Sequence, residues 1–196
     1  LMCFAIAAQL GLDATQVDFS AAYVNATMKE DLWMYCPEGI PGVPHIGTDG
    51  KRRVCKVLRS LFGFKQSGAA WTELLDNTMR AIGNLPPVDK SFSPDLAPPD
   101  GIPGLSCTVS ASDPNVYRYD RGGEVCFVCI YSDDCLLFSS CSKLRDDIVR
   151  AMKHFKLRDL GQAKSFLGIK IEKSVPKDGG LAYTLSMPGY IRKLLK

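Results

Sequence analysis

Three aspartates are the side chains of this sequence best suited to chemistry. Asp18 lies at the end of an apolar-polar run, and Asp133 and Asp134 form an adjacent pair after a longer apolar run. If the segments that carry them are neighbours, the three carboxylates converge and repel one another unless cations lie between them. The pattern therefore predicts a site for Mg²⁺, with Mn²⁺ as the alternative. Such metals align the attacking and leaving oxygens in phosphoryl transfer.

Short strands must position these acids. Residues 15–19 predict a strand around Asp18, and residues 125–131 and 135–138 predict two antiparallel strands joined by the turn that holds the acidic pair. An Asp-Asp pair in a hairpin turn is also ordinary turn chemistry and needs no ligand. The apolar strands on both sides favour a functional site, because they place the pair at the end of a buried hairpin.

The remaining elements indicate an α+β fold with an antiparallel sheet and helices on one face. Ser20 and Ser142 are each placed to cap a helix. Residues 84–107 hold six of the twelve prolines with almost no periodicity, which predicts a loop insertion. Further strands are expected at residues 32–36, 53–57, 116–119, 166–171 and 183–185, and helices at the N-terminus up to Gly11, at 68–82 and from 142 to 155.

Composition excludes several classes of function. A net charge of +3 is too small to indicate a nucleic-acid partner by itself. Cys126 and Cys129 are three residues apart on a predicted strand, so they point to opposite faces and cannot share a metal; free thiols are the expectation. His45 and His154 are the only histidines, which leaves few candidates for a zinc hydrolase or a Ser-His-Asp triad.

The two ends of the sequence lie inside helical patterns. The apolar run at residues 1–8 has no preceding basic stretch and is shorter than the ~20 residues that span a membrane, so neither a secretory signal nor a membrane anchor is expected. The simplest interpretation is a segment of a longer polypeptide.

Six short blocks, found along the chain outside the proline-rich stretch, form an ordered series. They are QVDFSAAYVN at 16–25, WMYCPEG at 33–39, VCKVLRSLFGFKQ at 54–66, YSDD at 131–134, RDLGQAKSFLGI at 158–169, and YI at 190–191. The series resembles the motifs of reverse transcriptases from copia-type LTR retrotransposons, which are RNA-directed DNA polymerases. One short match would be weak evidence, whereas six in order are strong.

The resemblance implies a right-hand polymerase palm with fingers and a ferredoxin-like antiparallel sheet. Residues 1–196 would form the palm/fingers core, without the N-terminal part of the fingers. Expected partners are an RNA or DNA template with its primer and a dNTP, and no membrane; RNase H and integrase segments are expected in the full polyprotein. The implied location is intracellular, in a cytoplasmic virus-like particle, with the nucleus as the alternative.

The same resemblance assigns the catalytic metal ligands. Asp18, Asp133 and Asp134 would bind Mg²⁺, with the backbone carbonyl of Phe19 as an extra ligand. Ser132 stands where the family usually has an apolar residue, and this variable position is not expected to disable the metal site.

Further roles follow from the other blocks. Tyr23 would lie under the incoming sugar and exclude a 2′-hydroxyl, with core packing as its alternative. Gln66 would lie near the nucleotide and template. Lys156 and Lys164 both remain open as the lysine near the leaving pyrophosphate. Phe166, Leu167 and Gly168 would form the primer grip, where glycine permits close approach of the primer backbone.

Two rival functions remain. The first is a catalytically inactive retroelement remnant that keeps the fold and a nucleic-acid-binding surface. The second is another two-metal palm enzyme, such as a nucleotide cyclase. The primer-grip block disfavours the second, because a cyclase has no primer to hold.

Overall fold

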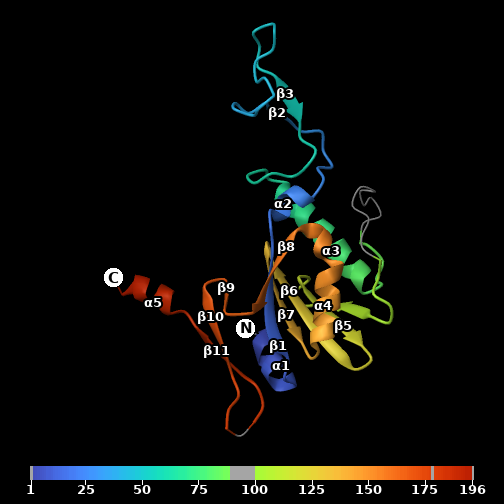
Figure 1. Ribbon diagram of the computed structural model, residues 1–196, viewed down its shortest axis with the longest axis vertical. Helices are drawn as coiled ribbons and strands as arrows, with labels where there is room; N and C mark the ends of the chain where they lie inside the picture. The colour runs from blue at the N-terminus through green and yellow to red at the C-terminus, as the bar shows by residue number, and fades with distance from the viewer. Residues whose placement is uncertain (1, 89–99, 178, 196) are drawn as a thin grey trace. The chain divides into compact units, whose positions relative to one another are not determined.

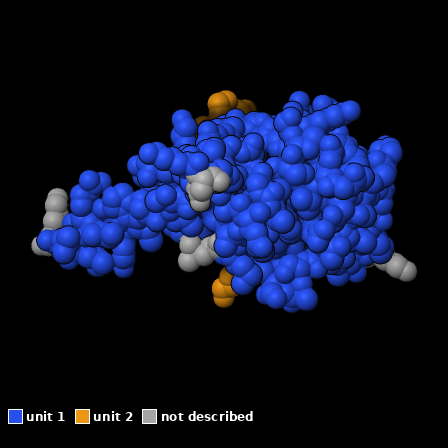
Figure 2. All heavy atoms as spheres, turned by 90° about the horizontal axis from the view of Figure 1, so that it is seen from below, with its two compact units in different colours: residues 1–20, 76–196 blue, residues 21–75 orange. Residues whose placement is uncertain are grey.

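A computed structural model describes residues 2–88, 100–177 and 179–195 (Figure 1). The chain divides into two compact units, one formed by residues 1–20 with 76–196 and the other by residues 21–75. Figure 2 shows the first unit in blue and the second in orange. The expectation of one palm/fingers core over residues 1–196 stays a prediction.

The first unit is built on a six-stranded antiparallel sheet, in agreement with the predicted mixture of helices and antiparallel strands. Its strands, in spatial order, are β4 (Ser106–Val109), β5 (Val116–Arg121), β6 (Glu124–Tyr131), β7 (Asp134–Ser139), β1 (Asp13–Phe19) and β8 (Leu157–Gln162). Val17 and Phe19 of β1 are buried. The first strand of the sequence therefore lies inside the sheet, between two strands that come more than a hundred residues later.

One face of this sheet is covered by α1 (Met2–Leu10) and by a small sheet in the order β11-β10-β9. Phe4 of α1 packs edge-on against Phe138 of β7, with ring centroids 4.9 Å apart, and against Tyr183 at 5.4 Å. The Tyr183 hydroxyl also donates a hydrogen bond to the Leu12 carbonyl at 2.7 Å. The three strands are β9 (Ser165–Phe166), β10 (Ile169–Ser174) and β11 (Ala182–Ser186).

The opposite face is covered by α4 (Ser142–Ala151) and by the C-terminal part of α3 (Ser67–Ile82). Arg145 of α4 donates to Thr15 Oγ1 at 3.2 Å, and the preceding residue, Ala14, lies in the core under α1. Because neighbouring strand residues point to opposite faces, α4 and α1 lie on different sides. The prediction of helices on one face is therefore wrong. The apolar side of α1 packs against Phe138 and forms a separate hydrophobic cluster on the face opposite α4.

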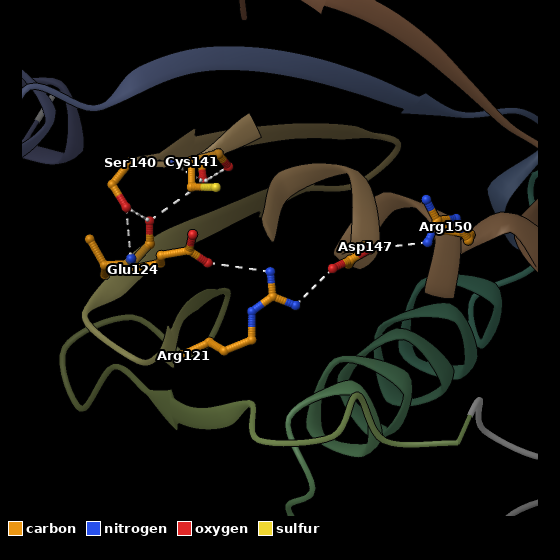
Figure 3. A network of polar contacts seen from close by, with 8 residues as sticks. Arg121, Glu124, Ser140, Cys141, Asp147 and Arg150 are labelled. Atoms are coloured by element: carbon orange, nitrogen blue, oxygen red, sulfur yellow. Dashed lines mark hydrogen bonds and ion pairs between the residues drawn. The ribbon is translucent and has the colours of Figure 1, made fainter. Parts of the chain in front are cut away.

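An ion-pair network joins α4 to the turn between β5 and β6 (Figure 3). The Arg121 guanidinium donates to Asp147 of α4 at 2.7 Å and to Glu124 at 3.3 Å, and Arg150 donates to Asp147 at 3.0 Å. Arg121 holds the pKa of the Asp147 carboxyl below its ordinary value. The network therefore fixes α4 against the start of β6. This end of the β6–β7 hairpin is the one away from the acidic turn.

The second unit contains α2 (Ala22–Asn25), the antiparallel pair β2 (Trp33–Tyr35) and β3 (Val54–Lys56), and the start of α3. The structure confirms the strands predicted at residues 32–36 and 53–57 and pairs them with each other. The first unit also contains the 3₁₀ turn η2 (Lys153–Phe155) and the short helix α5 (Pro188–Leu194).

Several predicted boundaries differ from the structure. Neither predicted serine cap forms: Ala21 and Cys141 occupy the cap positions of α2 and α4, without a side-chain cap bond. The predicted strand at 166–171 is interrupted by a turn at Leu167 and Gly168, because both residues have positive φ. Strand β4 begins at Ser106, inside the predicted loop at 84–107; residues 89–99 of that loop lie outside the described residues.

A close approach explains why a glycine follows α3 directly. A Cβ atom at Gly83 would lie 2.0 Å from the Cβ of Cys107 in β4, so only glycine lets the end of the helix reach this strand. None of the helices within the described ranges has the length and apolar character needed to cross a membrane.

Candidate active site

Strand register brings two of the three aspartates opposite each other. Asp18 of β1 pairs with Asp134 of β7, and the Phe19 N–H donates to the Asp133 carbonyl at 2.8 Å. Directly opposed residues in an antiparallel pair point to the same face, with Cβ atoms about 4.5–5.5 Å apart. The backbone thus places the acidic turn beside the end of β1 and holds it there by a main-chain hydrogen bond.

The acidic turn is a tight two-residue connection. Tyr131 pairs with Asp134, which leaves only Ser132 and Asp133 to reverse the chain. Ser132 has φ of 54°, a left-handed conformation that non-glycine residues seldom adopt, and its hydroxyl donates to Asp133 Oδ1 at 2.9 Å. Such local strain persists when the surrounding structure fixes it, and it is common at functional sites.

Two of the carboxylates have polar partners from neighbouring strands. Arg158 of β8 pairs with Asp18 in the strand register and donates to its Oδ2 atom twice, from Nε at 3.0 Å and from Nη2 at 2.7 Å. Gln16 Nε2 donates to Asp134 Oδ1 at 3.2 Å. Arg158 is largely exposed, and the Asp18 side chain is 22% exposed. The charge of Asp18 is therefore balanced by an arginine that solvent can reach.

The residues at this site fit a divalent metal in donor type. Carboxylate oxygens are the ligands that Mg²⁺ prefers, and Asp18, Asp133 and Asp134 supply them from adjoining backbone positions. Within the described ranges, however, no three His, Cys, Asp or Glu side chains are grouped so that they could hold one ion. The side chain of Asp18 is turned to Arg158, so binding of an ion by all three acids requires that this pair open.

Phe19 has a structural role besides its predicted one. Its ring is buried and meets the ring of Phe155 edge-on, with centroids 5.8 Å apart. Together with the N–H bond to Asp133, this packing fixes the backbone of Phe19 beside the acids. The predicted use of its carbonyl as a metal ligand stays a prediction.

Tyr23 and Gln66 belong to the second unit. Tyr23 lies in α2, half-buried, with its ring edge-on to Phe62 at a centroid distance of 4.7 Å. Gln66 directly precedes α3, and its carbonyl accepts the Ala70 N–H at 2.9 Å. Within this unit, Tyr23 therefore contacts the SLFGFKQ block that carries Gln66. The predicted roles of both residues in nucleotide binding stay predictions.

The predicted primer-grip residues form a tight turn. Phe166 of β9 pairs with Ile169 of β10, and the two residues between them, Leu167 and Gly168, have φ of 50° and 79°. Two positive φ values in a two-residue loop are typical of a type I′ hairpin turn, and a leucine there is unusual. Leu167 is 47% exposed at this turn. The structure thus presents a strained apolar side chain where the sequence predicted a contact with the primer.

The two candidate lysines are both exposed. Lys156 has φ of 39°, and its carbonyl accepts the Ser20 N–H at 3.2 Å. The Lys164 carbonyl accepts the Ile171 N–H at 2.8 Å. These contacts use the backbones only, so the choice between the two side chains remains open.

Sequence reasoning missed Arg158 and Gln16 as neighbours of the acids. Gln16 lies two residues before Asp18, so strand alternation already put both on one face. Arg158 gave no such signal, because β8 was not expected as a strand. Its exposed, charged residues and Gly161 lack the apolar alternation that identifies strands.

Comparison with known proteins agrees with the motif series. Residues 1–87 match the family described as "Reverse transcriptase (RNA-dependent DNA polymerase)". The chain is 29% identical to the "Retrovirus-related Pol polyprotein from transposon TNT 1-94" of Nicotiana tabacum, over 97% of the chain and 12% of that protein. It is 28% identical to the "Retrovirus-related Pol polyprotein from transposon RE1" of Arabidopsis thaliana, over 92% of the chain and 10% of that protein.

A third relative is the putative transposon Ty5-1 protein of Saccharomyces cerevisiae, 26% identical over 90% of the chain and 47% of that protein. No solved structure gives a significant match. The chain thus spans less than half the length of each of these three relatives. The motif series, the family match and the transposon relatives agree, and the chain is a relative of the reverse transcriptases in the Pol polyproteins of copia-type retrotransposons.

Proposed function

We propose that this chain is the polymerase core of an RNA-directed DNA polymerase, which transfers a nucleotide from a dNTP to the 3′-hydroxyl of a primer by a two-metal mechanism. The observation that carries the proposal is the register of Asp18 opposite Asp134, with Asp133 held beside them by the Phe19 N–H. The six-stranded sheet would be the palm of a right-hand polymerase.

The chain's own residues prepare the site by fixing the acids on rigid strands. Bound Mg²⁺ or Mn²⁺ would activate the primer hydroxyl and neutralise charge on the triphosphate. Asp18, Asp133 and Asp134 would bind the ions. Arg158 neutralises Asp18 while the site holds no cation and must turn away when one binds. Because Arg158 is exposed, its release into solvent has a small electrostatic cost.

A local concentration of positive charge supports a nucleic-acid partner. Residues 51–65 contain six basic residues and no acidic residue, although the whole chain carries only +3. All six are exposed: Lys51, Arg52, Arg53, Lys56, Arg59 and Lys65. Trp33 and Tyr35 of the adjoining strand are also exposed, and the Arg52 guanidinium lies 4.4 Å from the centre of the Tyr35 ring. Basic side chains with exposed aromatic rings suit a template strand that must be bound regardless of its sequence.

The test of the proposed activity is primer extension by the variant Asp133→Asn. Extension with Mg²⁺ or Mn²⁺ on an RNA template should fall by more than about 100-fold, since even residues that only support metal ligands are worth about 10- to 100-fold. The melting temperature should stay near that of the wild type, because Asp133 lies in a turn and is only partly buried. Asp113→Asn makes the same chemical change in another turn of this unit and should extend normally. Extension by Asp133→Asn at the wild-type rate would show that other groups bind the metals.

The inactive remnant is the second candidate. The pairing of Asp18 with Arg158, and the lack of a ready group of three metal-binding side chains among the described residues, favour it. The same experiment separates the two functions. A wild-type chain that binds template-primer but extends no primer, also when lengthened at its N-terminus, would be the remnant.

A further inference from the structure

Two cysteines far apart in the sequence have their sulfur atoms in contact. Cys3 lies in the first turn of α1 and Cys129 in β6, and their Sγ atoms are 3.4 Å apart. Both side chains are half-buried. Neither cysteine lies in one of the six motif blocks, and neither has a role in the proposed polymerase chemistry.

The thiol pair opens on a small apolar cavity of about 160 Å³. Cys3 and Cys129 line it together with Phe166 and Leu167 of the β9–β10 turn. A cavity of this size admits a small uncharged reagent, since a water molecule needs only about 10–15 Å³ of such volume. The two sulfurs are therefore close together and within reach of small solutes.

The two thiols differ in character. The Cys129 thiol donates a hydrogen bond to the Cys3 sulfur, which lowers the pKa of Cys3 to about 6 and raises that of Cys129. Burial, in contrast, raises the pKa of Cys107 to about 11. Since the thiolate is the reactive form, Cys3 is the nucleophile of the pair at neutral pH. Cys129 is the thiol that can then attack the oxidised Cys3 and form the disulfide.

We propose that Cys3 and Cys129 form a reversible disulfide that ties α1 to β6, and that hydrogen peroxide is the oxidant. The inference is independent of the proposed polymerase function, because it needs only the contact of the two sulfurs and their access from the cavity. Cys129 lies two residues before Tyr131, at the base of the acidic turn, so the cross-link would join α1 to the strand that carries this turn.

The reaction balances in two steps. The Cys3 thiolate attacks one peroxide oxygen; an S–O bond forms, the O–O bond breaks, and the leaving hydroxide takes up a proton to become water. The Cys129 sulfur, losing its proton, then attacks the sulfenic sulfur of Cys3; the S–S bond forms, the S–O bond breaks, and the departing hydroxide accepts that proton as a second water. Two electrons pass from the two thiols to the hydrogen peroxide.

Only a small movement is required. The sulfurs must close from 3.4 Å to the S–S bond length of about 2 Å. Cys129 can keep its place in β6, which stays hydrogen-bonded to β5 and β7.

The experiment is disulfide mapping after mild oxidation. The reduced chain is treated with one equivalent of hydrogen peroxide at pH 7, blocked with N-ethylmaleimide, and analysed as intact protein and as peptides without reduction. The expected result is a peptide linking Cys3 to Cys129, an intact mass with two fewer maleimide groups, and reversal by dithiothreitol. Cys3→Ser and Cys129→Ser should each lose the linked peptide, whereas Cys141→Ser, a half-buried cysteine outside the pair, should keep it. A different pairing, or none, would overturn the proposal.

A second measurement does not depend on the cross-link. In the wild type, maleimide should modify Cys3 faster than Cys141 at pH 7, and Cys129→Ala should slow the modification of Cys3 by about tenfold, because the thiolate loses its hydrogen-bond donor. A melting curve of each variant identifies any that fail to fold. Equal rates for Cys3 and Cys141 in the folded wild type would show that the contact does not activate Cys3.

Discussion

The pairing of Asp18 with Arg158 has consequences for how the site would accept a cation. Both residues sit opposite each other on β1 and β8, and two hydrogen bonds of 3.0 and 2.7 Å join the guanidinium to one carboxylate oxygen. A cation at Asp18 must compete with a fixed positive charge. Because Arg158 is 71% exposed, this competition is screened and should be modest.

Removal of that charge should therefore strengthen metal binding. We expect Arg158→Gln to raise the affinity for Mn²⁺ by up to about fivefold, which corresponds to the ~1 kcal/mol upper range for exposed ion pairs. Electron paramagnetic resonance of free Mn²⁺ measures this binding without any assay of activity. Arg158→Lys keeps the charge and should bind Mn²⁺ like the wild type. Weaker binding by Arg158→Gln would mean that Arg158 holds Asp18 in place instead of competing for it.

Sugar selection is the second prediction about a single residue. If Tyr23 packs under the incoming nucleotide, its ring leaves no space for a 2′-hydroxyl, so Tyr23→Ala should increase ribonucleotide incorporation far more than it lowers deoxynucleotide incorporation. The measurement is the ratio of kcat/KM for dNTP and rNTP. Tyr23→Phe keeps the ring and should keep the ratio.

The contact of Tyr23 with Phe62 supplies the alternative outcome. Loss of a ring from a core costs about 3–5 kcal/mol, and a half-buried ring should cost less. An unchanged sugar ratio in Tyr23→Ala, together with a lowered melting temperature, would make Tyr23 a packing residue only.

At the scale of elements, local patterns predicted the hairpins and most helices. The β6–β7 hairpin follows from two apolar runs around a short polar turn, and α3 from its apolar spacing, which the structure extends by one residue to Ser67. Strand β8 was missed because its stability comes from pairing with β1, about 140 residues away, and no local feature encodes that contact. The same reason hid Arg158 from the predicted site.

The turn at Leu167 was missed for a different reason. Gly168 can adopt the positive φ that a type I′ turn needs, but the residue before it must also have a positive φ. Leucine seldom adopts such a conformation, so Leu167 gives no signal of a turn. The sequence thus predicted one continuous strand where the structure has a hairpin. The helix caps were wrong because serine is favourable at a cap but does not fix its position.

The junction between α3 and β4 gives a stability prediction. Gly83→Ala would place a Cβ atom 2.0 Å from that of Cys107, so the elements must move apart, and we expect a loss of about 1–3 kcal/mol in the free energy of unfolding. Urea denaturation measures it. Gly68→Ala, near the start of α3, is the matched control: its Cβ meets nothing within 4 Å, so the change should be neutral or stabilising by up to ~1 kcal/mol.

Cys107→Gly should restore part of the loss in a double variant, because it removes the nearest clashing atom, while the Cα and N atoms of residue 107 would still lie 3.0 and 3.1 Å from the added Cβ. Additive effects of the two substitutions would show that the helix end tolerates a methyl group by another movement.

At the scale of the whole molecule, charge is nearly balanced but unevenly distributed. If residues 51–65 bind the phosphate backbone, replacing Lys51, Arg52 and Arg53 by alanine should weaken binding equally for unrelated template-primer sequences. The slope of log affinity against log salt should fall by up to about 2.7, since each lost phosphate contact is worth about 0.9.

Fluorescence anisotropy of a labelled template-primer between low and moderate salt measures this slope. The charge-preserving triple variant Lys51→Arg, Arg52→Lys and Arg53→Lys should keep it. A slope that does not change in the alanine variant would place the nucleic-acid contact elsewhere on the chain.

The position of β1 inside the sheet also determines when the chain can fold. Strand β1 leaves the ribosome before both of its neighbours in the sheet, β7 and β8, which end at Ser139 and Gln162. Until both have been synthesised, β1 exposes unpaired backbone and the apolar side chains of Val17 and Phe19. Contacts of such long sequence separation form slowly. The three acids therefore come together only after β7 has been synthesised, and a nascent chain interrupted before β7 would carry Asp18 without the strand that places Asp133 and Asp134 beside it.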